Sequence, residues 1–320
     1  MGMMIDGAWV RENRVRSDAA GEFRRPDTTF RDRIEPGGRF PPEAGRYHLY
    51  VSLACPWAHR TLIFRRLKRL EGIIGLSVVH WLMGDDGWTF ADGEGVIPDP
   101  VMGARYLHDL YAHADARFSG RVSVPVLWDR ATDNIVNNES AEIIRIFNAT
   151  FDGIGAAPGD YYPAALRAEI DAVNARVYAT VNNGVYRAGF ATTQAAYEAA
   201  VMPLFDTLDW LEERLSRQPY LCGERVTEAD WRLFTTLIRF DAVYHGHFKC
   251  NLRRIVDYPA LWDYTRSLFQ ADRVAGTVDF GHIKRHYYMS HPWVNPSRIV
   301  PAGPVLDLAS PGSRVPRQPG

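Results

Sequence analysis

The sequence predicts an α/β domain followed by an all-helical domain. The chain has 320 residues, which is more than one domain usually contains. From Tyr47 the apolar pattern changes between strand-like and helix-like periods, as expected of strands joined by helices. After Asp152 the strand-like runs stop, and helix-like runs continue to about residue 269. The domain boundary is therefore expected in residues 153–160, which are rich in glycine, alanine and proline.

The composition excludes several functional classes. The formal net charge of −1 predicts no general attraction to nucleic acid or to anionic membranes. No apolar run is long enough to span a bilayer, and the first residues lack the pattern of a signal peptide. Three cysteines in so long a chain do not make a disulfide framework, which favours a reducing compartment. We therefore expect a cytoplasmic protein with no nucleic-acid or membrane partner.

Residues 1–46 are expected to form an irregular, extended arm. They are rich in arginine, aspartate, glycine and proline, which interrupt regular structure. The arm carries aromatic side chains, which indicate docking on the protein rather than disorder: Trp9, Phe23, Phe30 and Phe40.

A cysteine lies at the first turn from strand to helix. Residues 46–52 alternate as a strand does, and residues 61–67 have the pattern of a helix. Between them, Cys55 is followed by Pro56, which favours the first helical turn because its missing N–H needs no partner there. Cys55 is therefore expected at a helix N-terminus, where unpaired N–H groups and the helix dipole stabilise the nucleophilic thiolate.

A second strand is predicted over residues 76–81, and the strand–helix–strand order predicts a parallel pair with a crossover helix. Residues 82–120 form a long insertion, with a short helix expected over residues 104–114. A loop of this length inside a compact domain is usually functional.

The strand predicted over residues 121–129 contains Pro125. Proline cannot donate a hydrogen bond to the ladder, so it is expected at the start or edge of a strand. A tight bend with a cis bond between Val124 and Pro125 is the specific alternative.

The domain ends with a short strand and a helix. The strand is predicted over residues 134–136 and the helix over residues 141–148. Asn138 is a good N-cap residue and is expected to cap this helix.

The second half contains four predicted helices, over residues 163–182, 193–217, 228–245 and 258–270. The run Thr-Glu-Ala-Asp at residues 227–230 resembles a capping box with aspartate in place of glutamate. Residues 276–320 are expected to form a polar, aromatic and proline-rich tail, mobile from Gly303 onward.

Together, these features resemble the glutathione transferases. The shared features are the Cys-Pro helix start, the Val-Pro strand, the Glu-Ser helix start and the helical second half. The fuller motifs resemble a more specific group, the glutathionyl-hydroquinone reductases of the xi class. These motifs are CPWAHR at 55–60, the long loop with Trp88, Val124-Pro125, NNES at 137–140 and HYYMSH at 286–291. The resemblance extends from the arm to about residue 304.

The resemblance implies a thioredoxin-like domain that binds glutathione and a helical domain that binds the second substrate. These correspond to residues 47–152 and 153–275, with an N-terminal extension over 1–46 and a tail over 276–320 that packs near the active site. It also implies a homodimer that uses glutathione as co-substrate and no metal. The implied activity is the reduction of glutathionyl-hydroquinones to hydroquinones.

Glutathione is an anionic tripeptide that makes three demands on a site. Its backbone needs a strand edge, its γ-glutamyl carboxylate a helix start, and its amino group a carboxylate. Val124, Ser140 and Glu139 can meet these demands in that order. The resemblance assigns all three to glutathione, with Arg121 for the glycyl carboxylate and Trp88 as a flat apolar cover. The alternative is that Glu139 and Ser140 only cap a helix and that Trp88 belongs to the core.

Cys55 determines the expected reaction, because a cysteine can form a mixed disulfide with glutathione where most glutathione transferases use a hydroxyl to activate it. Position 58 is alanine, so no Cys-x-x-Cys partner can resolve that disulfide. The other cysteines, Cys222 and Cys250, fall in the helical half. We therefore expect a second glutathione to resolve the disulfide, with ping-pong kinetics.

The resemblance assigns Tyr186, Tyr244 and Tyr287 to the second substrate. Phenol rings can stack on a quinol ring, and their hydroxyls can hydrogen-bond its oxygens. Tyr186 is implied as the proton donor to the leaving ring carbon. Tyr244 and Tyr287 are implied to form hydrogen bonds that favour the thiolate.

Two other functions remain open from the sequence. An omega-like thioltransferase or dehydroascorbate reductase would share Cys55 but would not need Trp88 or the tyrosine-bearing tail. A non-catalytic interaction module would not need its active-site residues, and here they persist. A zinc site at His245, His247 and Cys250 is set aside, because no fourth ligand lies at a suitable spacing.

Overall fold

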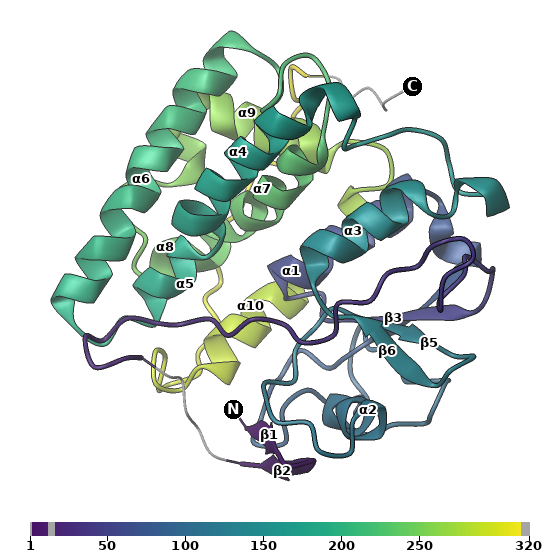
Figure 1. Ribbon diagram of the computed structural model, residues 1–320. Helices are drawn as coiled ribbons and strands as arrows, with labels where there is room; N and C mark the ends of the chain where they lie inside the picture. The colour runs from purple at the N-terminus through teal and green to yellow at the C-terminus, as the bar shows by residue number, and fades with distance from the viewer. Residues whose placement is uncertain (1, 12–16, 315–320) are drawn as a thin grey trace. The chain divides into compact units, whose positions relative to one another are not determined.

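The computed structural model describes residues 2–11 and 17–314 and divides into two compact units (Figure 1). The first unit comprises Met1–Val15, Pro26–Pro158 and Thr277–His286, and the second comprises Arg16–Arg25, Gly159–Gly276 and Tyr287–Gly320. The N-terminal extension and the tail each contribute to both units, so the four ranges predicted from sequence do not coincide with them and remain a prediction. Within the described part of the chain, no helix is both long enough and apolar enough to cross a bilayer.

A four-stranded mixed sheet forms the centre of the first unit. Its strands are β3 (Tyr47–Val51), β4 (Ile74–Val78), β5 (Val126–Asp129) and β6 (Asn134–Asn137), in the spatial order β4-β3-β5-β6. Strands β3 and β4 are parallel, as the strand–helix–strand order predicts, and β5 is antiparallel to both β3 and β6. The strand predicted over residues 76–81 is shifted, since β4 begins two residues earlier, at Ile74, and ends at Val78.

Helices cover both faces of this sheet. Helices α1 (Pro56–Leu67) and α3 (Ser140–Ala149) lie together on one face, and α2 (Leu107–Ala114) lies on the other (Figure 1). The apolar side chains that face inward are fully buried, among them Leu49, Ile63 and Phe147. Burial of each such side chain stabilises the fold by roughly 1.5–3 kcal/mol. This arrangement is the thioredoxin-like domain that the sequence predicts.

The peptide bond between Val124 and Pro125 is cis, which was the specific alternative at this position. The strand predicted over residues 121–129 is shorter than expected, since β5 spans only Val126–Asp129. The last residue pair of the β3–β5 ladder is Tyr50 with Val126, so Val124 lies beyond the ladder.

The arm predicted to be irregular begins with a β-hairpin, β1 (Met3–Ile5) and β2 (Ala8–Val10). Asp6 and Gly7 form its turn, and both have positive φ, 48° and 77°. An Asp-Gly pair favours such a two-residue turn because both positions require the left-handed region. The prediction missed the hairpin because strands this short do not show a readable alternation.

The second unit is helical. Its longer helices are α4 (Arg167–Val177), α6 (Gln194–Arg217), α7 (Glu228–Arg239) and α9 (Pro259–Phe269). Shorter elements are α5 (Gly184–Gly189), α8 (His245–His247) and the π-helical turns η4 (Tyr178–Asn182) and η5 (Phe240–Tyr244). The capping box predicted at residues 227–230 is present at the start of α7. Helix α5 was not predicted, because its six residues are too few to show a helical period.

Short 3₁₀ turns complete the fold: η1 (Leu70–Gly72), η2 (Asp152–Ile154), η3 (Ala164–Leu166), η6 (Ile255–Asp257) and η7 (Ala275–Thr277).

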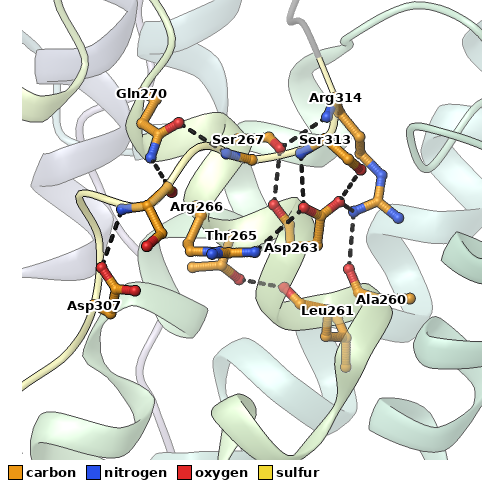
Figure 2. A network of polar contacts seen from close by, with 12 residues as sticks. Ala260, Leu261, Asp263, Thr265, Arg266, Ser267, Gln270, Asp307, Ser313 and Arg314 are labelled. Carbon is orange, nitrogen blue, oxygen red and sulfur yellow. Dashed lines mark hydrogen bonds and ion pairs between the residues drawn. The ribbon is translucent and has the colours of Figure 1, made fainter.

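The predicted tail contains a further helix, α10 (Phe280–Ser290), which begins in the first unit and ends in the second. Beyond it, the chain is held against α9, as Figure 2 shows. The Ser313 N–H donates to Asp263 Oδ1 at 2.7 Å, and Arg314 Nη1 lies 2.8 Å from Asp263 Oδ2. These contacts contradict the expected mobility as far as Arg314, while residues 315–320 lie outside the described part of the chain.

Candidate active site

Cys55 is the N-cap residue of α1, as the sequence predicts, and it is half-buried. Its backbone is extended (φ −77°, ψ 121°), and Pro56 begins the helix. The Cys55 thiol lies 3.6 Å from the carbonyl oxygen of Val124. The unpaired N–H groups and positive dipole of the first helical turn favour a negative charge on the sulfur. The fold thus brings the predicted nucleophile next to the predicted binding edge for a peptide backbone.

Glu139 and Ser140 form the start of α3. Glu139 is the N-cap residue, and its Oε1 accepts a hydrogen bond from the Ala141 N–H at 3.0 Å. The Thr28 hydroxyl donates to the other carboxylate oxygen at 3.3 Å. The carboxylate and the Ser140 hydroxyl therefore lie side by side at the positive end of a helix, where an α-amino acid group can pair with both.

Asn138 is not the cap of α3, and that prediction was wrong. Its amide Nδ2 donates to the Tyr111 hydroxyl at 3.1 Å, while its Oδ1 accepts from the Phe30 N–H at 3.3 Å. Glutamate is a less common cap than asparagine, but here the asparagine is already engaged with the arm and with α2.

Arg60 lies behind Ser140 and was not among the predicted site residues. The side chain is 1% exposed, and its Nη1 donates to Ser140 Oγ at 3.4 Å. Its guanidinium also lies over the ring of Trp57, 4.6 Å from the centroid. Only the position of Arg60 inside the CPWAHR motif could have indicated it from sequence, because its partner is 80 residues away.

Trp88 lies in the long loop of the first unit and is 6% exposed. Its ring stacks on His286, with centroids 4.8 Å apart and planes at 23°. His286 Nδ1 lies 3.0 Å from the carbonyl oxygen of Trp81, so the imidazole is anchored to the same loop. Arg121 is half-buried, three residues before Val124. The roles of Trp88 and Arg121 stay predictions.

The second unit brings the three predicted tyrosines together. The Tyr287 hydroxyl lies 2.5 Å from that of Tyr186 and 3.0 Å from that of Tyr244. Exposure is 9% for Tyr186 and at most 1% for the other two. Burial raises the pKa values of Tyr244 and Tyr287 well above their ordinary value, so both are protonated phenols at neutral pH. The cluster can donate hydrogen bonds and pass a proton along three hydroxyls.

The other cysteines and histidines have different surroundings. Burial raises the pKa of Cys222 to about 12 and raises that of Cys250, so neither forms a thiolate at neutral pH. His247 Nε2 lies 3.1 Å from His291 Nδ1, which makes the pair part of the aromatic packing around Phe248. Among the residues that the structure describes, no group of three or more metal-binding side chains is placed to hold an ion.

Two family descriptions match the chain. "Glutathione S-transferase, N-terminal domain" matches residues 54–150, and "Glutathione S-transferase, C-terminal domain" matches residues 194–267.

Several curated relatives match nearly the whole chain, among them the following three. A "Glutathionyl-hydroquinone reductase PcpF" from Sphingobium chlorophenolicum is 56% identical over 96% of this chain and 98% of its own. A "Glutathionyl-hydroquinone reductase YqjG" from Escherichia coli is 51% identical, with 98% of both chains covered. A "Glutathione S-transferase omega-like 2" from Schizosaccharomyces pombe is 49% identical over 91% of this chain and 96% of its own.

Solved structures agree with these matches. The glutathione-bound structure of YqjG from Escherichia coli superposes with a TM-score of 0.90 at 49% identity, covering 98% of this chain and 99% of the other. A glutathione S-transferase Xi from Phanerochaete chrysosporium gives 0.89 at 52% identity, covering 92% and 96%.

Proposed function

Because this chain belongs to the xi class of the glutathione transferase superfamily, we propose that it is an enzyme that reduces glutathionyl-hydroquinones to hydroquinones with glutathione as reductant. The observation that carries this proposal is the position of Cys55. Its thiol faces the Val124 carbonyl at the N-terminus of α1, and position 58 is alanine. A cysteine in this setting favours disulfide chemistry with a bound tripeptide thiol over conjugation.

Glutathione binds along the first unit in this scheme. Its cysteine backbone pairs with Val124, beyond the end of the β3–β5 ladder. Its γ-glutamyl carboxylate accepts a hydrogen bond from the Ser140 hydroxyl and lies at the N-terminus of α3. Its ammonium group pairs with Glu139. Arg121 pairs with the glycyl carboxylate, and Trp88 covers the ligand.

The first half-reaction forms a mixed disulfide. The Cys55 thiolate attacks the glutathionyl sulfur of the substrate, and a sulfur–sulfur bond forms as the bond from sulfur to the ring carbon breaks. The electron pair of the broken bond stays on the ring carbon, which takes a proton. Hydroquinone leaves, and Cys55 remains bound to glutathione through a disulfide.

The second half-reaction regenerates the thiolate. A second glutathione thiolate attacks the glutathione sulfur of the mixed disulfide, so that oxidised glutathione leaves and Cys55 is released. Cys222 and Cys250 take no part, because both are thiols at neutral pH.

The tyrosine cluster supplies the proton in this proposal. Tyr186 donates to the ring carbon, and Tyr287 hydrogen-bonds the resulting phenolate of Tyr186. The raised pKa of Tyr287 supports this role, since it keeps the hydroxyl protonated as a donor.

The test is steady-state kinetics with glutathionyl-menadiol and glutathione. The wild-type enzyme is expected to give the parallel double-reciprocal lines of a ping-pong mechanism. Cys55→Ser should reduce kcat by roughly a thousandfold or more, because the attacking sulfur is lost. Cys250→Ala, a change at a buried thiol outside the site, is the matched control and should keep kcat. A Cys55→Ser enzyme of near wild-type rate would refute the mechanism.

An omega-like activity is the second candidate, because relatives that are 49% and 40% identical are named omega-like. It requires turnover of dehydroascorbate or of small mixed disulfides with the same Cys55. Direct comparison of kcat/KM for dehydroascorbate and glutathionyl-menadiol separates the two. A higher value for dehydroascorbate would favour the second candidate.

We also propose that the protein is a homodimer and acts where glutathione is kept reduced, most simply in the cytoplasm. Light scattering after size exclusion should give twice the mass of one chain. A mass equal to one chain at micromolar concentration would contradict the dimer.

A further inference from the structure

Arg60 is a buried cation at the back of the proposed glutathione site. It is only 1% exposed, on the side of α1 that packs on α3. A guanidinium is costly to bury, because it loses hydration that the protein must replace. Part of that replacement is visible, since Nη1 donates to Ser140 Oγ at 3.4 Å and the charge lies over the ring of Trp57.

The contact with Ser140 is long, at 3.4 Å, but it favours one orientation of the serine hydroxyl. A serine hydroxyl has one O–H to donate and two lone pairs to accept with. Because Arg60 can only donate, it occupies a lone pair of Ser140 Oγ and leaves the O–H to point elsewhere. In this structure the O–H points to Glu139 Oε1 over a long 3.5 Å. This weak bond is readily exchanged for a ligand oxygen.

We propose that Arg60 is a positioning residue for glutathione, which holds Ser140 as a donor and places a positive charge behind the γ-glutamyl carboxylate. The inference rests on the proposed function, in which Ser140 receives that carboxylate. Ser140 is 3% exposed, so the charges meet where water screens them little. Arg60 thereby selects ligands that carry a carboxylate at this position.

Another arginine of α1 provides a matched comparison. Arg65 is also buried, but its guanidinium donates to the backbone carbonyls of Ile74 and Glu71, at 2.7 Å and 3.2 Å respectively. Arg65 therefore ties α1 to the segment that leads into β4, and it has no contact with Ser140 among those described. Loss of either arginine should lower stability, whereas only Arg60 should affect recognition of the carboxylate.

The experiment measures binding of two ligands to the reduced protein by calorimetry. The first ligand is glutathione, and the second is 4-aminobutyryl-cysteinyl-glycine, which is glutathione without the γ-glutamyl α-carboxylate. The proteins are wild type, Arg60→Met, Arg60→Lys and Arg65→Met. Thermal unfolding of each protein verifies that it is folded at the assay temperature.

Arg60→Met should weaken glutathione binding by about tenfold to a hundredfold, the range expected for a hydrogen bond to a charged group. It should change binding of the truncated ligand less than about twofold, because that ligand lacks the charge concerned. Arg60→Lys should restore part of the loss, since it keeps the charge but not the planar geometry. Arg65→Met should leave the ratio of the two affinities unchanged.

Kinetics provide a second measure. Arg60→Met should raise the KM for glutathione and leave the single-turnover rate at saturating glutathione near that of wild type. If Arg60→Met weakens both ligands by the same factor, or neither ligand, the positioning role is refuted while the proposed function stands. If wild type itself does not bind glutathione, the proposed function fails first.

Discussion

At the scale of the residue, the protein uses burial to keep side chains in one protonation state. Tyr287 lies between the hydroxyls of Tyr186 and Tyr244, and its raised pKa keeps it a phenol. His48 shows the opposite effect on a base, because burial lowers its pKa to about 4. Its Nε2 lies 2.8 Å from Ser77 Oγ, which itself donates to the Pro98 carbonyl. Ser77 therefore accepts from His48, and the imidazole is held neutral with its proton on Nε2.

Tyr287→Phe should slow the first half-reaction by about tenfold to a hundredfold, because it removes the hydrogen bond to the phenolate left on Tyr186, while leaving the second half-reaction unchanged. The reason is that only the first step needs a proton at carbon. Single-turnover rates of mixed-disulfide formation and resolution give this measurement. Tyr288→Phe is the control, since that hydroxyl donates to the Ala242 carbonyl instead. Equal slowing of both steps in Tyr287→Phe would contradict the assignment.

His48 predicts a loss of stability in acid. Its pKa is lower in the folded state than in the unfolded state, so the unfolded chain binds more protons below pH 6.5. The free energy of unfolding should therefore fall as the pH drops from about 6.5 to about 4, by roughly 3 kcal/mol at most. Urea unfolding of wild type and His48→Gln across this range tests it, because glutamine keeps a donor for Ser77 without titrating. The same pH dependence in both proteins would exclude His48 as the cause.

At the scale of the element, the start of α7 is held by several hydrogen bonds to one buried carboxylate. Asp230 is fully buried and accepts hydrogen bonds from four donors: Thr227 N, Thr227 Oγ1, Leu221 N and the Tyr264 hydroxyl. The carboxylate thus joins the helix cap to the preceding turn and to α9. A local sequence motif has become a tertiary connection between two helices.

Asp230→Ala should lower the free energy of unfolding by roughly 3 kcal/mol or more, because several buried donors lose their acceptor. Tyr264→Phe removes one of these bonds and should cost about 1 kcal/mol. Asp206→Ala, at an exposed position of α6, is the control and should change stability by less than about 0.5 kcal/mol. If Asp230→Ala lowers the free energy of unfolding no more than the control does, the capping box of α7 contributes little to stability.

At the scale of the whole molecule, the last described residues are part of the fold. Arg314 donates to the carbonyl oxygen of Ala260 and pairs with Asp263, and Ser313 binds the same carboxylate (Figure 2). Arg314 also donates to the carbonyl oxygen of Leu215. Gly312 approaches the chain at Ser267 so closely that an added Cβ would lie 2.8 Å from its backbone nitrogen. The end of the described tail is therefore packed against α6 and α9.

Arg314→Ala should lower the free energy of unfolding by about 1–2 kcal/mol, because the largely buried carboxylate of Asp263 loses one of its partners and two carbonyls lose a donor. Chemical unfolding followed by circular dichroism measures this loss. Arg225→Ala, at an exposed position, is the control and should have little effect. An Arg314→Ala protein as stable as the control would mean that the contacts of Arg314 with α9 do not contribute measurably to the free energy of unfolding.

The local features could be predicted from the sequence alone: the cysteine at a helix start, the parallel strand pair, the cap of α7 and the change from mixed to helical structure. Each depends on residues close together in the chain, so that residue type and spacing are sufficient to predict it. Very short elements could not be predicted in this way, and β1, β2 and α5 were missed.

Contacts between side chains that are distant in the chain could be identified only from the folded protein. Examples are Arg60 with Ser140, Trp88 with His286, the three tyrosine hydroxyls, and Arg314 with Asp263. No local pattern specifies these pairs, because each is set by the packing of elements far apart in the chain. In a close-packed interior, a side chain takes the partner that the neighbouring backbone brings within reach.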